Sequence, residues 1–359
     1  MAIHFHTLRI KEVKKETDDC VSISFFVPEE LKSVYNFSHG QNITLRNTIN
    51  GEDIRRSYSI CAAPFENELR VAVKRAEFGL FSNFANENLK AGDSLQVLPP
   101  TGKFYTKLDT SHRKKYLALA AGSGITPVIS ILKTTLKEEP FSDFTLVYGN
   151  RSKASIIFLE ELEALKNEYL DRFTLLHILS REKIDAPINS GRIDAAKLDQ
   201  LSKIIDYNKM DEIFICGPEE MVFSAEQFLL IKKIDKKKIH FELFTTPGRK
   251  NIANRSQQTA VLNKDLVSTI TIRIDGRSFD FDLAFDGDVI LNAALKQGAD
   301  LPFACKGGVC ASCRAKLLEG EVEMDMNWAL EPEEVEQGYI LTCQSHPKTK
   351  KILIDFNYR

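Results

Sequence analysis

The sequence predicts a multidomain protein with an antiparallel β-barrel, an α/β domain with a doubly wound parallel sheet, and an α+β domain of the β-grasp type. Short alternating apolar runs come first, longer apolar runs between amphipathic segments follow, and cysteines cluster near the C-terminus. A chain of 359 residues has the length of about two or three domains. We place them at residues 1–107, 108–246 and 267–359, with a linker at 247–266, where Pro, Gly, Asn and Ser interrupt the apolar periodicity.

The predicted barrel rests on short segments separated by Pro, Gly and Asn turns. Val21–Phe25, Ile43–Leu45 and Leu69–Val73 each carry apolar side chains at every second position. Because successive side chains of a strand point to opposite faces, this alternation indicates strands with one buried face. Several such strands in succession favour a small antiparallel barrel.

From Lys115 the pattern changes to buried apolar strands separated by amphipathic helical segments. The predicted strands are Tyr116–Ala121, Phe144–Tyr148, Phe173–Leu179, Ile213–Cys216 and Ile239–Phe244. The connections between them are long enough for a helix, which parallel strands require. These residues therefore predict a doubly wound parallel sheet.

The C-terminal segment begins with a hairpin signal and a helix. Ile270–Ile274 and Phe279–Leu283 flank Asp275-Gly276, a dipeptide that favours a two-residue turn. Asp288–Gln297 has the pattern of a helix, and Gly298 follows in the position that often ends one. A hairpin and helix that lead into a cysteine loop predict a β-grasp domain.

Four cysteines in this segment have the spacing C-x4-C-x2-C-x29-C, which is typical of a plant-type [2Fe–2S] ferredoxin. They are Cys305, Cys310, Cys313 and Cys343. Gly307 and Gly308 suit a loop that brings backbone N–H groups close to sulfur. A four-cysteine zinc site and two disulfides are the alternatives, but zinc prefers paired C-x2-C units and Cys343 stands alone.

Composition narrows the class of protein. With 43% hydrophobic and 27% charged residues the chain can bury ordinary cores, and its net charge of −2 excludes a generally basic nucleic-acid-binding protein. Met1–Lys15 lacks the apolar core of a signal peptide, and seven cysteines favour a reducing compartment, so we expect a cytoplasmic protein. Tyr116–Leu132, the longest uncharged stretch, is too short to span a membrane.

The acidic residues are unevenly distributed. From Val267 to the end there are 15 acidic and 10 basic residues, and Glu319–Glu336 holds eight carboxylates with no Lys or Arg. Such a stretch is either a solvated face or a docking surface for a basic electron acceptor.

Two short motifs in the barrel segment suit a flavin. Arg56-Ser57-Tyr58-Ser59 offers a cation for the pyrophosphate, an aromatic face for the isoalloxazine or ribityl chain, and a small donor near N5. Gly79-Leu80-Phe81-Ser82 opens a helix whose N-terminus can hold the second phosphate. Either motif alone is a weak signal, because Arg and Tyr are common on strand edges.

Two glycine motifs lie where predicted parallel strands end. Gly122-Ser-Gly124-Ile-Thr126-Pro127 follows a buried strand and opens a helix, as a dinucleotide phosphate cradle requires. Cys216-Gly217-Pro218 ends the fourth strand, at the edge where open α/β sheets bind ligands. For Cys216 the alternative is a small buried thiol before a turn.

Taken in order, Arg-x-Tyr-Ser, Val-Lys, Gly-x-x-Ser, Gly-x-Gly-x-x-Pro and Cys-Gly-Pro resemble the ferredoxin–NADP reductase superfamily. The cluster domain makes the chain similar to reductase components of bacterial multicomponent oxygenases. Residues 71–75, 79–84, 305–310, 330–334 and 338–345 are most similar to the reductase subunits of phenylacetyl-CoA epoxidases. The resemblance covers nearly the whole chain.

This resemblance implies roles for individual residues. It implies FAD contacts from Arg56, Ser57, Tyr58, Ser59, Ala72, Val73, Lys74, Gly79, Leu80, Phe81 and Ser82. It implies nicotinamide-nucleotide contacts from Gly122, Gly124, Thr126, Pro127, Cys216, Gly217 and Pro218, and a catalytic group of Ser59, Cys216 and Glu242. It also implies that Phe244 covers the flavin, although the end of a core strand is an equal alternative.

Ser180 and Arg181 follow the third parallel strand and resemble the family's reader of the 2′-phosphate. A guanidinium and a hydroxyl suit a phosphomonoester, whereas a carboxylate there would suit NADH, so we favour NADPH. The alternative is an exposed turn.

These observations predict an electron path from NADPH through FAD and a [2Fe–2S] cluster to a di-iron oxygenase, with phenylacetyl-CoA epoxidase favoured, in phenylacetate catabolism. A steroid, alkane or aromatic-ring hydroxylase is the nearest alternative partner. A zinc-binding interaction module is the alternative from a different class.

Overall fold

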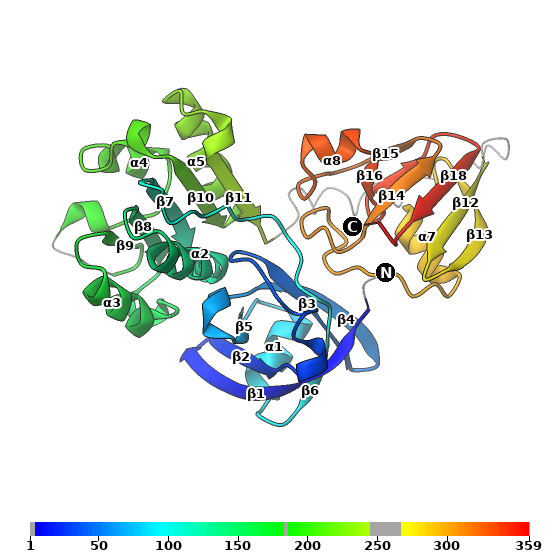
Figure 1. Ribbon diagram of the computed structural model, residues 1–359, viewed down its shortest axis with the longest axis horizontal. Helices are drawn as coiled ribbons and strands as arrows, with labels where there is room; N and C mark the ends of the chain where they lie inside the picture. The colour runs from blue at the N-terminus through cyan, green and yellow to red at the C-terminus, as the bar shows by residue number, and fades with distance from the viewer. Residues whose placement is uncertain (1–3, 183–185, 245–266, 359) are drawn as a thin grey trace. The chain divides into compact units, whose positions relative to one another are not determined.

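The computed structural model describes residues 4–182, 186–244 and 267–358 (Figure 1). The residues form two compact units, a larger one of Thr7–Ile54 with Tyr58–Phe244 and a smaller one built mainly from the C-terminal segment. The linker predicted at 247–266 lies outside the described residues. The domain boundary at residue 107 stays a prediction, because the flanking segments belong to one unit.

The N-terminal half of the larger unit is the antiparallel barrel that the sequence predicts. Its strands are β1 (His6–Thr17), β2 (Cys20–Phe26), β3 (Asn42–Ile49), β4 (Glu52–Ser59), β5 (Leu69–Lys74) and β6 (Ser94–Val97), in the order β4-β3-β6-β1-β2-β5. A bridge between Ile60 and Val71 joins the two ends of this sheet. Helix α1 (Leu80–Glu87) follows β5 and contacts it.

The second half is the predicted doubly wound sheet. Its parallel strands are β7 (Lys115–Ala121), β8 (Asp143–Asn150), β9 (Phe173–Leu179), β10 (Glu212–Gly217) and β11 (Ile239–Leu243), in the order β11-β10-β7-β8-β9. Its helices are α2 (Ile125–Glu138), α3 (Leu159–Glu168), α4 (Ala195–Leu201) and α5 (Glu219–Ile231). Figure 1 shows α2 and α3 on one face and α4 and α5 on the other. The chain order reverses between β7 and β10, so ligands are expected at their carboxyl ends.

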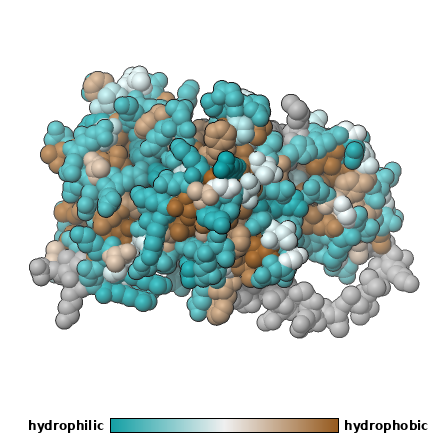
Figure 2. All heavy atoms as spheres, turned by 90° about the horizontal axis from the view of Figure 1, so that it is seen from below, coloured by the Kyte–Doolittle hydropathy of each residue, from teal (hydrophilic) through white to brown (hydrophobic). Residues whose placement is uncertain are grey.

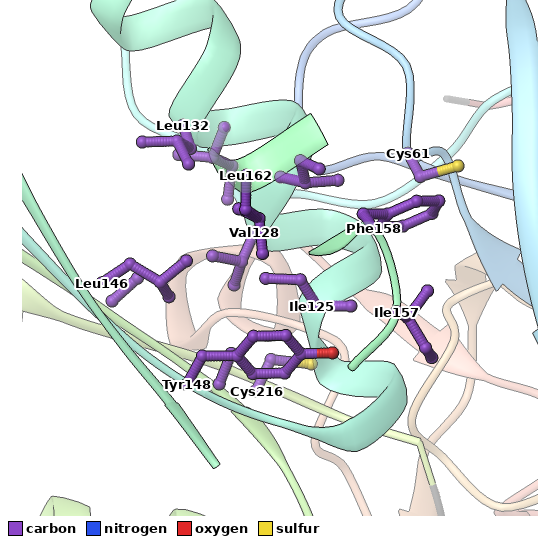
Figure 3. Packing of buried hydrophobic residues seen from close by; sticks show 14 of the residues in the cluster. Cys61, Ile125, Val128, Leu132, Leu146, Tyr148, Ile157, Phe158, Leu162 and Cys216 are labelled. Carbon is purple, nitrogen blue, oxygen red and sulfur yellow. The ribbon is translucent and has the colours of Figure 1, made fainter. Parts of the chain in front are cut away.

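The barrel has a hydrophobic core of its own, and a few barrel residues also pack into the core of the parallel sheet. Cys20 and Cys61 from the barrel are fully buried in the same cluster as residues of α2 and the sheet, as expected for core thiols. Figure 3 shows side chains of α2, β8 and the segment before α3 pointing toward one another in this core. Lys133 is only 4% exposed, and its Nζ lies 2.7 Å from the Glu66 carboxylate of the barrel and 2.8 Å from that of Glu161 on α3. These contacts fix the barrel against the sheet.

The smaller unit has the predicted β-grasp arrangement. Its strands are β12 (Val267–Ile274), β13 (Arg277–Ala284), β14 (Arg314–Glu319), β15 (Val322–Met324), β16 (Tyr339–Leu341), β17 (Ser345–Pro347) and β18 (Lys351–Asp355), and its helices α7 (Ile290–Lys296) and α8 (Pro332–Glu336). The main sheet has the order β13-β12-β18-β14-β16. Asp275 and Gly276 have φ of 51° and 71°, as the predicted hairpin turn requires.

The predicted elements are close to the observed ones, with small differences at their ends. The helix expected over Asp288–Gln297 covers Ile290–Lys296, and β11 ends at Leu243 rather than Phe244. In the described part of the chain no helix is both long enough and apolar enough to cross a membrane. The face in Figure 2 is largely hydrophilic, with hydrophobic side chains scattered among polar ones.

Candidate cofactor sites

The glycine turn after β7 is shaped by close contact with β10. The short helix Gly122–Gly124 connects β7 directly to α2, and Gly122 has a φ of 54°. A Cβ on Gly124 would lie 2.0 Å from the carbonyl oxygen of Cys216, so no larger residue fits there. The Tyr148 hydroxyl donates to the Gly122 carbonyl at 2.9 Å. The turn therefore presents bare backbone at the carboxyl edge of the sheet, which is the surface that a pyrophosphate needs.

Asn150 ends β8 at the same edge and has an unusual environment. Asn150 is 8% exposed. Neither the nitrogen nor the oxygen of its side-chain amide is in hydrogen-bonding geometry with a described residue. A buried polar group without a partner costs about 1–3 kcal/mol. A nucleotide at the edge of the sheet would offer the missing donors and acceptors, so this edge fits the predicted nicotinamide nucleotide.

Three side chains from different strands meet beside this turn. The Ser59 hydroxyl, at the end of β4, donates to Oε2 of Glu242 in β11 at 3.1 Å. Cys216 lies opposite Glu242 in the β10–β11 register. Burial, together with the nearby Glu242 carboxylate, raises the pKa of the Cys216 thiol well above its usual value. The structure thus brings together the three predicted catalytic residues, with the thiol neutral and the hydroxyl bonded to a carboxylate.

Phe244 follows β11 directly and is 41% exposed. Its side chain is therefore not buried in the core of the sheet, and its role over the flavin stays a prediction. Thr126 and Pro127 are buried in the first turn of α2, where the Thr126 hydroxyl donates to the Ser123 carbonyl at 3.0 Å. That bond stabilises the turn itself.

Some of the predicted flavin residues have side chains buried in the barrel core, and others keep polar groups that can reach a ligand. Tyr58 packs against Phe81 with ring centroids 5.6 Å apart. Ala72 and Val73 are buried, so only their backbone can reach a ligand. The Ser82 hydroxyl accepts the N–H of residue 76 at 3.0 Å and donates to the carbonyl of residue 79 at 3.2 Å. It therefore fixes the loop that leads into α1, whose first N–H groups have no acceptor within the helix.

Lys74 and Arg56 carry the positive charge near these elements. Arg56 is exposed on β4, and its guanidinium donates to the carbonyl of residue 55 at 2.7 Å. Lys74 ends β5, and a Cβ on Gly122 would lie 4.0 Å from its Nζ. Lys74 therefore lies where the barrel meets the glycine turn, and its Nζ is 3.5 Å from the Asp19 carboxylate.

The loops after β8 and β9 are joined by backbone hydrogen bonds. The Ser180 N–H donates to the Asn150 carbonyl at 3.0 Å, and the Arg181 N–H donates to the Arg151 carbonyl at 2.8 Å. Arg151 and Arg181 are both exposed. Two guanidinium groups thus start from adjacent positions at the carboxyl edge of the sheet.

The four predicted cluster cysteines lie together in the smaller unit, close enough to shift one another's pKa values. Cys305 and Cys310 influence each other in this way, and so do Cys313 and Cys343. All are free thiols. A cluster of two irons, each taking two thiolates, fits this arrangement.

Backbone and side-chain donors surround these sulfurs. The Gly307 N–H donates to Cys305 Sγ at 3.2 Å, and the Gln344 amide donates to Cys343 Sγ at 3.7 Å. Such donors favour the thiolate form and stabilise added negative charge, which raises the reduction potential of a bound cluster.

Comparisons with known proteins agree with these sites. Family models match an oxidoreductase FAD-binding domain at residues 7–105, an oxidoreductase NAD-binding domain at 118–227 and a 2Fe-2S iron-sulfur cluster binding domain at 272–348. The chain is 44% identical over 98% of its length to a subunit of the 1,2-phenylacetyl-CoA epoxidase of Escherichia coli K12, covering 98% of that protein. It is 34% identical to the ferredoxin reductase component of 3-ketosteroid-9-alpha-monooxygenase from Rhodococcus rhodochrous, covering 97% of this chain and 96% of that one.

The chain belongs to this family of flavin and iron–sulfur reductases. Phthalate dioxygenase reductase has the same fold, with a TM-score of 0.59 at 24% identity and 98% of each chain covered. The reductase is an oxidoreductase of the kind found in multicomponent oxygenases, and FAD, NAD(P)H and a [2Fe–2S] cluster are confirmed as its cofactors. The choice of NADPH and the individual site residues stay predictions.

Sequence reasoning did not name three residues that the structure places beside the predicted sites. Asn150 and Arg151 were missed although Gly149-Asn150-Arg151 ends a predicted strand at the carboxyl edge, which is a usable signal. Gln344 directly follows the last cysteine, and its donation to sulfur depends on a side-chain conformation that no pattern reveals.

Proposed function

We propose that this reductase transfers electrons from NADPH to the di-iron oxygenase component of a phenylacetyl-CoA epoxidase, in phenylacetate degradation. The observation that carries the proposal is 44% identity over 98% of both chains to the epoxidase protein, against 34% to the steroid monooxygenase component. A ten-point difference at nearly equal coverage favours the epoxidase over a steroid, alkane or aromatic-ring hydroxylase.

When bound, FAD and the cluster convert the electron pair of a hydride into single electrons for a one-electron acceptor. In the proposed site Ser59 would offer its hydroxyl to the flavin, and Glu242 accepts a hydrogen bond from that hydroxyl at 3.1 Å. Cys216, whose thiol is kept neutral by burial, would face the nicotinamide without adding charge. Placement of the two rings is the main contribution of these residues, because close and aligned reactants lose little further entropy on reaction.

The proposed preference for NADPH rests on Arg181, supported by Ser180 and by Arg151 on the adjacent loop. Guanidinium groups bind a phosphomonoester through paired, charge-assisted hydrogen bonds. The neighbouring Glu182 carboxylate accepts the backbone N–H of Lys153 at 2.7 Å. That bond holds Glu182 against the loop that follows β8.

We also propose that Glu319–Glu336 forms a docking surface for the acceptor. Of its eight carboxylates, Glu323, Asp325 and Glu334 are paired with Lys348, His346 and Arg314. Glu319, Glu321, Glu331, Glu333 and Glu336 are exposed and form no ion pair with a described residue. Unpaired carboxylates on one surface attract a basic partner and accelerate encounter at low salt.

The test is anaerobic reconstitution followed by turnover. The holoenzyme with NADPH is assayed with the oxygenase component of phenylacetyl-CoA epoxidase and, in parallel, with that of 3-ketosteroid 9α-monooxygenase. We expect coupled epoxidation at a much higher kcat/KM than steroid hydroxylation. Preference for the steroid system would refute the partner while leaving the reductase activity intact.

A further inference from the structure

Trp328 is the only tryptophan of the chain and is 41% exposed. It lies between β15 and α8, within the acidic stretch Glu319–Glu336. Its backbone N–H donates to the carbonyl of Gly308 at 3.0 Å, and Gly308 belongs to the loop that carries three cluster cysteines. The backbone of this large, exposed aromatic residue is therefore hydrogen-bonded to the cysteine loop.

The segment that carries Trp328 is held on both sides. The Asp325 N–H donates to the carbonyl of Gln344 at 2.9 Å, next to the fourth cysteine. The Asn327 side chain accepts the Leu330 N–H at 2.9 Å and donates to the Leu330 carbonyl at 3.2 Å, which closes a tight turn around Trp328. Hydrogen bonds thus already hold the backbone around Trp328. The loop therefore loses little conformational entropy when a partner buries the indole.

Gly308 brings the backbone of Trp328 close to the cluster ligands. The Gly308 carbonyl accepts the Trp328 N–H, and Gly308 lies within the loop between Cys305 and Cys310. A Cβ on Gly308 would come within 2.9 Å of the carbonyl of Met326, so this approach depends on glycine. Over the described residues 267–358, the other large exposed apolar side chains, of Val267, Leu318, Val335 and Tyr358, belong to residues that form no backbone hydrogen bond to the cysteine loop.

Carboxylates flank Trp328 along the sequence, Asp325 before it and Glu331 and Glu333 after it. Glu331 and Glu333 are exposed and form no ion pair with a described residue, and Asp325 carries only the His346 partner at 3.0 Å. An apolar aromatic centre within a charged rim is the composition of a binding hot spot, in which a few buried aromatics carry most of the affinity. The carboxylates match an acceptor whose corresponding surface is basic.

We infer that Trp328 is the anchor by which the oxygenase component docks over the cluster loop, its indole entering an apolar pocket rimmed by Lys and Arg on that partner. This inference rests on the proposed function, because it takes the acceptor to be an oxygenase component. In each encounter the reductase loses one electron at the cluster and the metal centre of the acceptor gains it. Trp328 itself is neither oxidised nor reduced and acts as a positioning residue.

The experiment compares three variants of the holoenzyme for anaerobic binding to the oxygenase component of phenylacetyl-CoA epoxidase, by isothermal titration calorimetry. Trp328→Ala removes the anchor, Trp328→Phe keeps an aromatic ring, and Leu318→Ala is the matched control. Leu318 is 40% exposed but lies near the far end of β14 from the cysteine loop. We expect Kd to rise at least tenfold for Trp328→Ala and less for Trp328→Phe, and to stay unchanged for Leu318→Ala. Ferricyanide reduction by NADPH should be the same in all variants.

An unchanged Kd for Trp328→Ala with intact cluster absorbance would overturn the inference. If Trp328→Ala loses its cluster, hydrogen exchange of the unmodified reductase tests the inference instead. Docking through Trp328 must protect the backbone amides of residues 325–331 from exchange. Absence of that protection would reject the anchor. Self-association of the reductase that Trp328→Ala abolishes would assign the surface to a second copy and reject an oxygenase partner there. If the unmodified reductase does not bind the epoxidase component, the proposed function fails separately. Binding of the same three variants is then measured with the oxygenase component that the reductase does reduce, and this result decides the role of Trp328.

Discussion

The nicotinamide edge of the parallel sheet and the cysteine loop are assembled in opposite ways. Ser59, Cys216 and Glu242 come from three strands of two sheets, and Ser59 meets a carboxylate 183 residues further along the chain. Three cluster cysteines instead lie within one loop, Cys305 to Cys313. The first site depends on how barrel and sheet pack together, and the second depends on local spacing. A change in packing should therefore damage only the first, and a change of one ligand only the second.

The largest effect is expected from loss of the isolated ligand. Cys343→Ser removes one thiolate of the Cys313–Cys343 pair, so transfer to an oxygenase component should be abolished while NADPH still bleaches the flavin. The measurement is the visible spectrum together with anaerobic stopped-flow reduction. Cys20→Ala, at a buried thiol in the barrel, is the control and should retain the cluster bands. Undiminished cluster absorbance in Cys343→Ser would show that this cysteine is not a ligand.

The second-largest effect is expected from a change in the packing of the glycine turn against β10. Gly124→Ala would place a Cβ 2.0 Å from the Cys216 carbonyl oxygen, which forces the turn away from β10 at a cost of about 3 kcal/mol or more. We expect hydride transfer from NADPH to slow by roughly 100-fold or more, with normal cluster content.

Gly149→Ala is the matched control for this variant. There the nearest atom to an added Cβ is the Ile193 methyl tip at 3.1 Å, which can move, so its rate should fall much less. Equal rates in the two variants would mean that the close approach of the turn to β10 is unimportant.

The same contrast explains how much the sequence predicts. The parallel strands are predicted to within about two residues because both faces of such strands are buried and read as continuous apolar runs. The first barrel strand, His6–Thr17, is not predicted. Its exposed face is dense with Lys and Glu, and register irregularities between Ile10 and Glu12 and between Lys15 and Thr17 interrupt the alternation.

Local sequence patterns also predict one candidate site better than the other. Spacing alone predicts the cysteine ligands, whereas Ser59 and Glu242 are grouped only through a family resemblance, since their contact depends on how barrel and sheet pack together rather than on a local pattern. The orphan amide of Asn150 arises from burial at the end of β8, which becomes apparent only when neighbouring strands and loops are in place. Distance along the chain therefore limits sequence-based prediction of the site.

The third prediction concerns discrimination between nucleotides at the nicotinamide edge. Arg181→Ala should raise KM for NADPH by roughly 10- to 100-fold, because a hydrogen bond to a charged group contributes about 1.5–3 kcal/mol. KM for NADH, which lacks the 2′-phosphate, should change little and is the internal control. Arg181→Lys should recover part of the loss, since an ammonium keeps the charge without the paired geometry. Equal losses with both nucleotides would overturn the assignment to the 2′-phosphate.

The smallest effect concerns the stability of the larger unit alone. Glu139 is fully buried, and although burial raises its pKa, hydrogen bonds from Ser142 at 2.7 Å, from the Asp109 N–H, from His112 and from Tyr116 bring its pKa below the ordinary value. A carboxyl with a lowered folded-state pKa stabilises the fold above its unfolded pKa, and this stability disappears as pH falls through the folded value.

Ser142→Ala removes one of those donors and should lower the free energy of unfolding by about 1–2 kcal/mol near neutral pH. The difference should shrink in acid as Glu139 protonates, and it should appear in the thermal melting of flavin fluorescence but not in bleaching of the cluster bands, which report the smaller unit. Ser111→Ala, at an exposed hydroxyl that bonds only Asp109, is the control. If Ser142→Ala shifted both transitions together, the two units would unfold as one, and the independence of the dispersed and local sites would be lost.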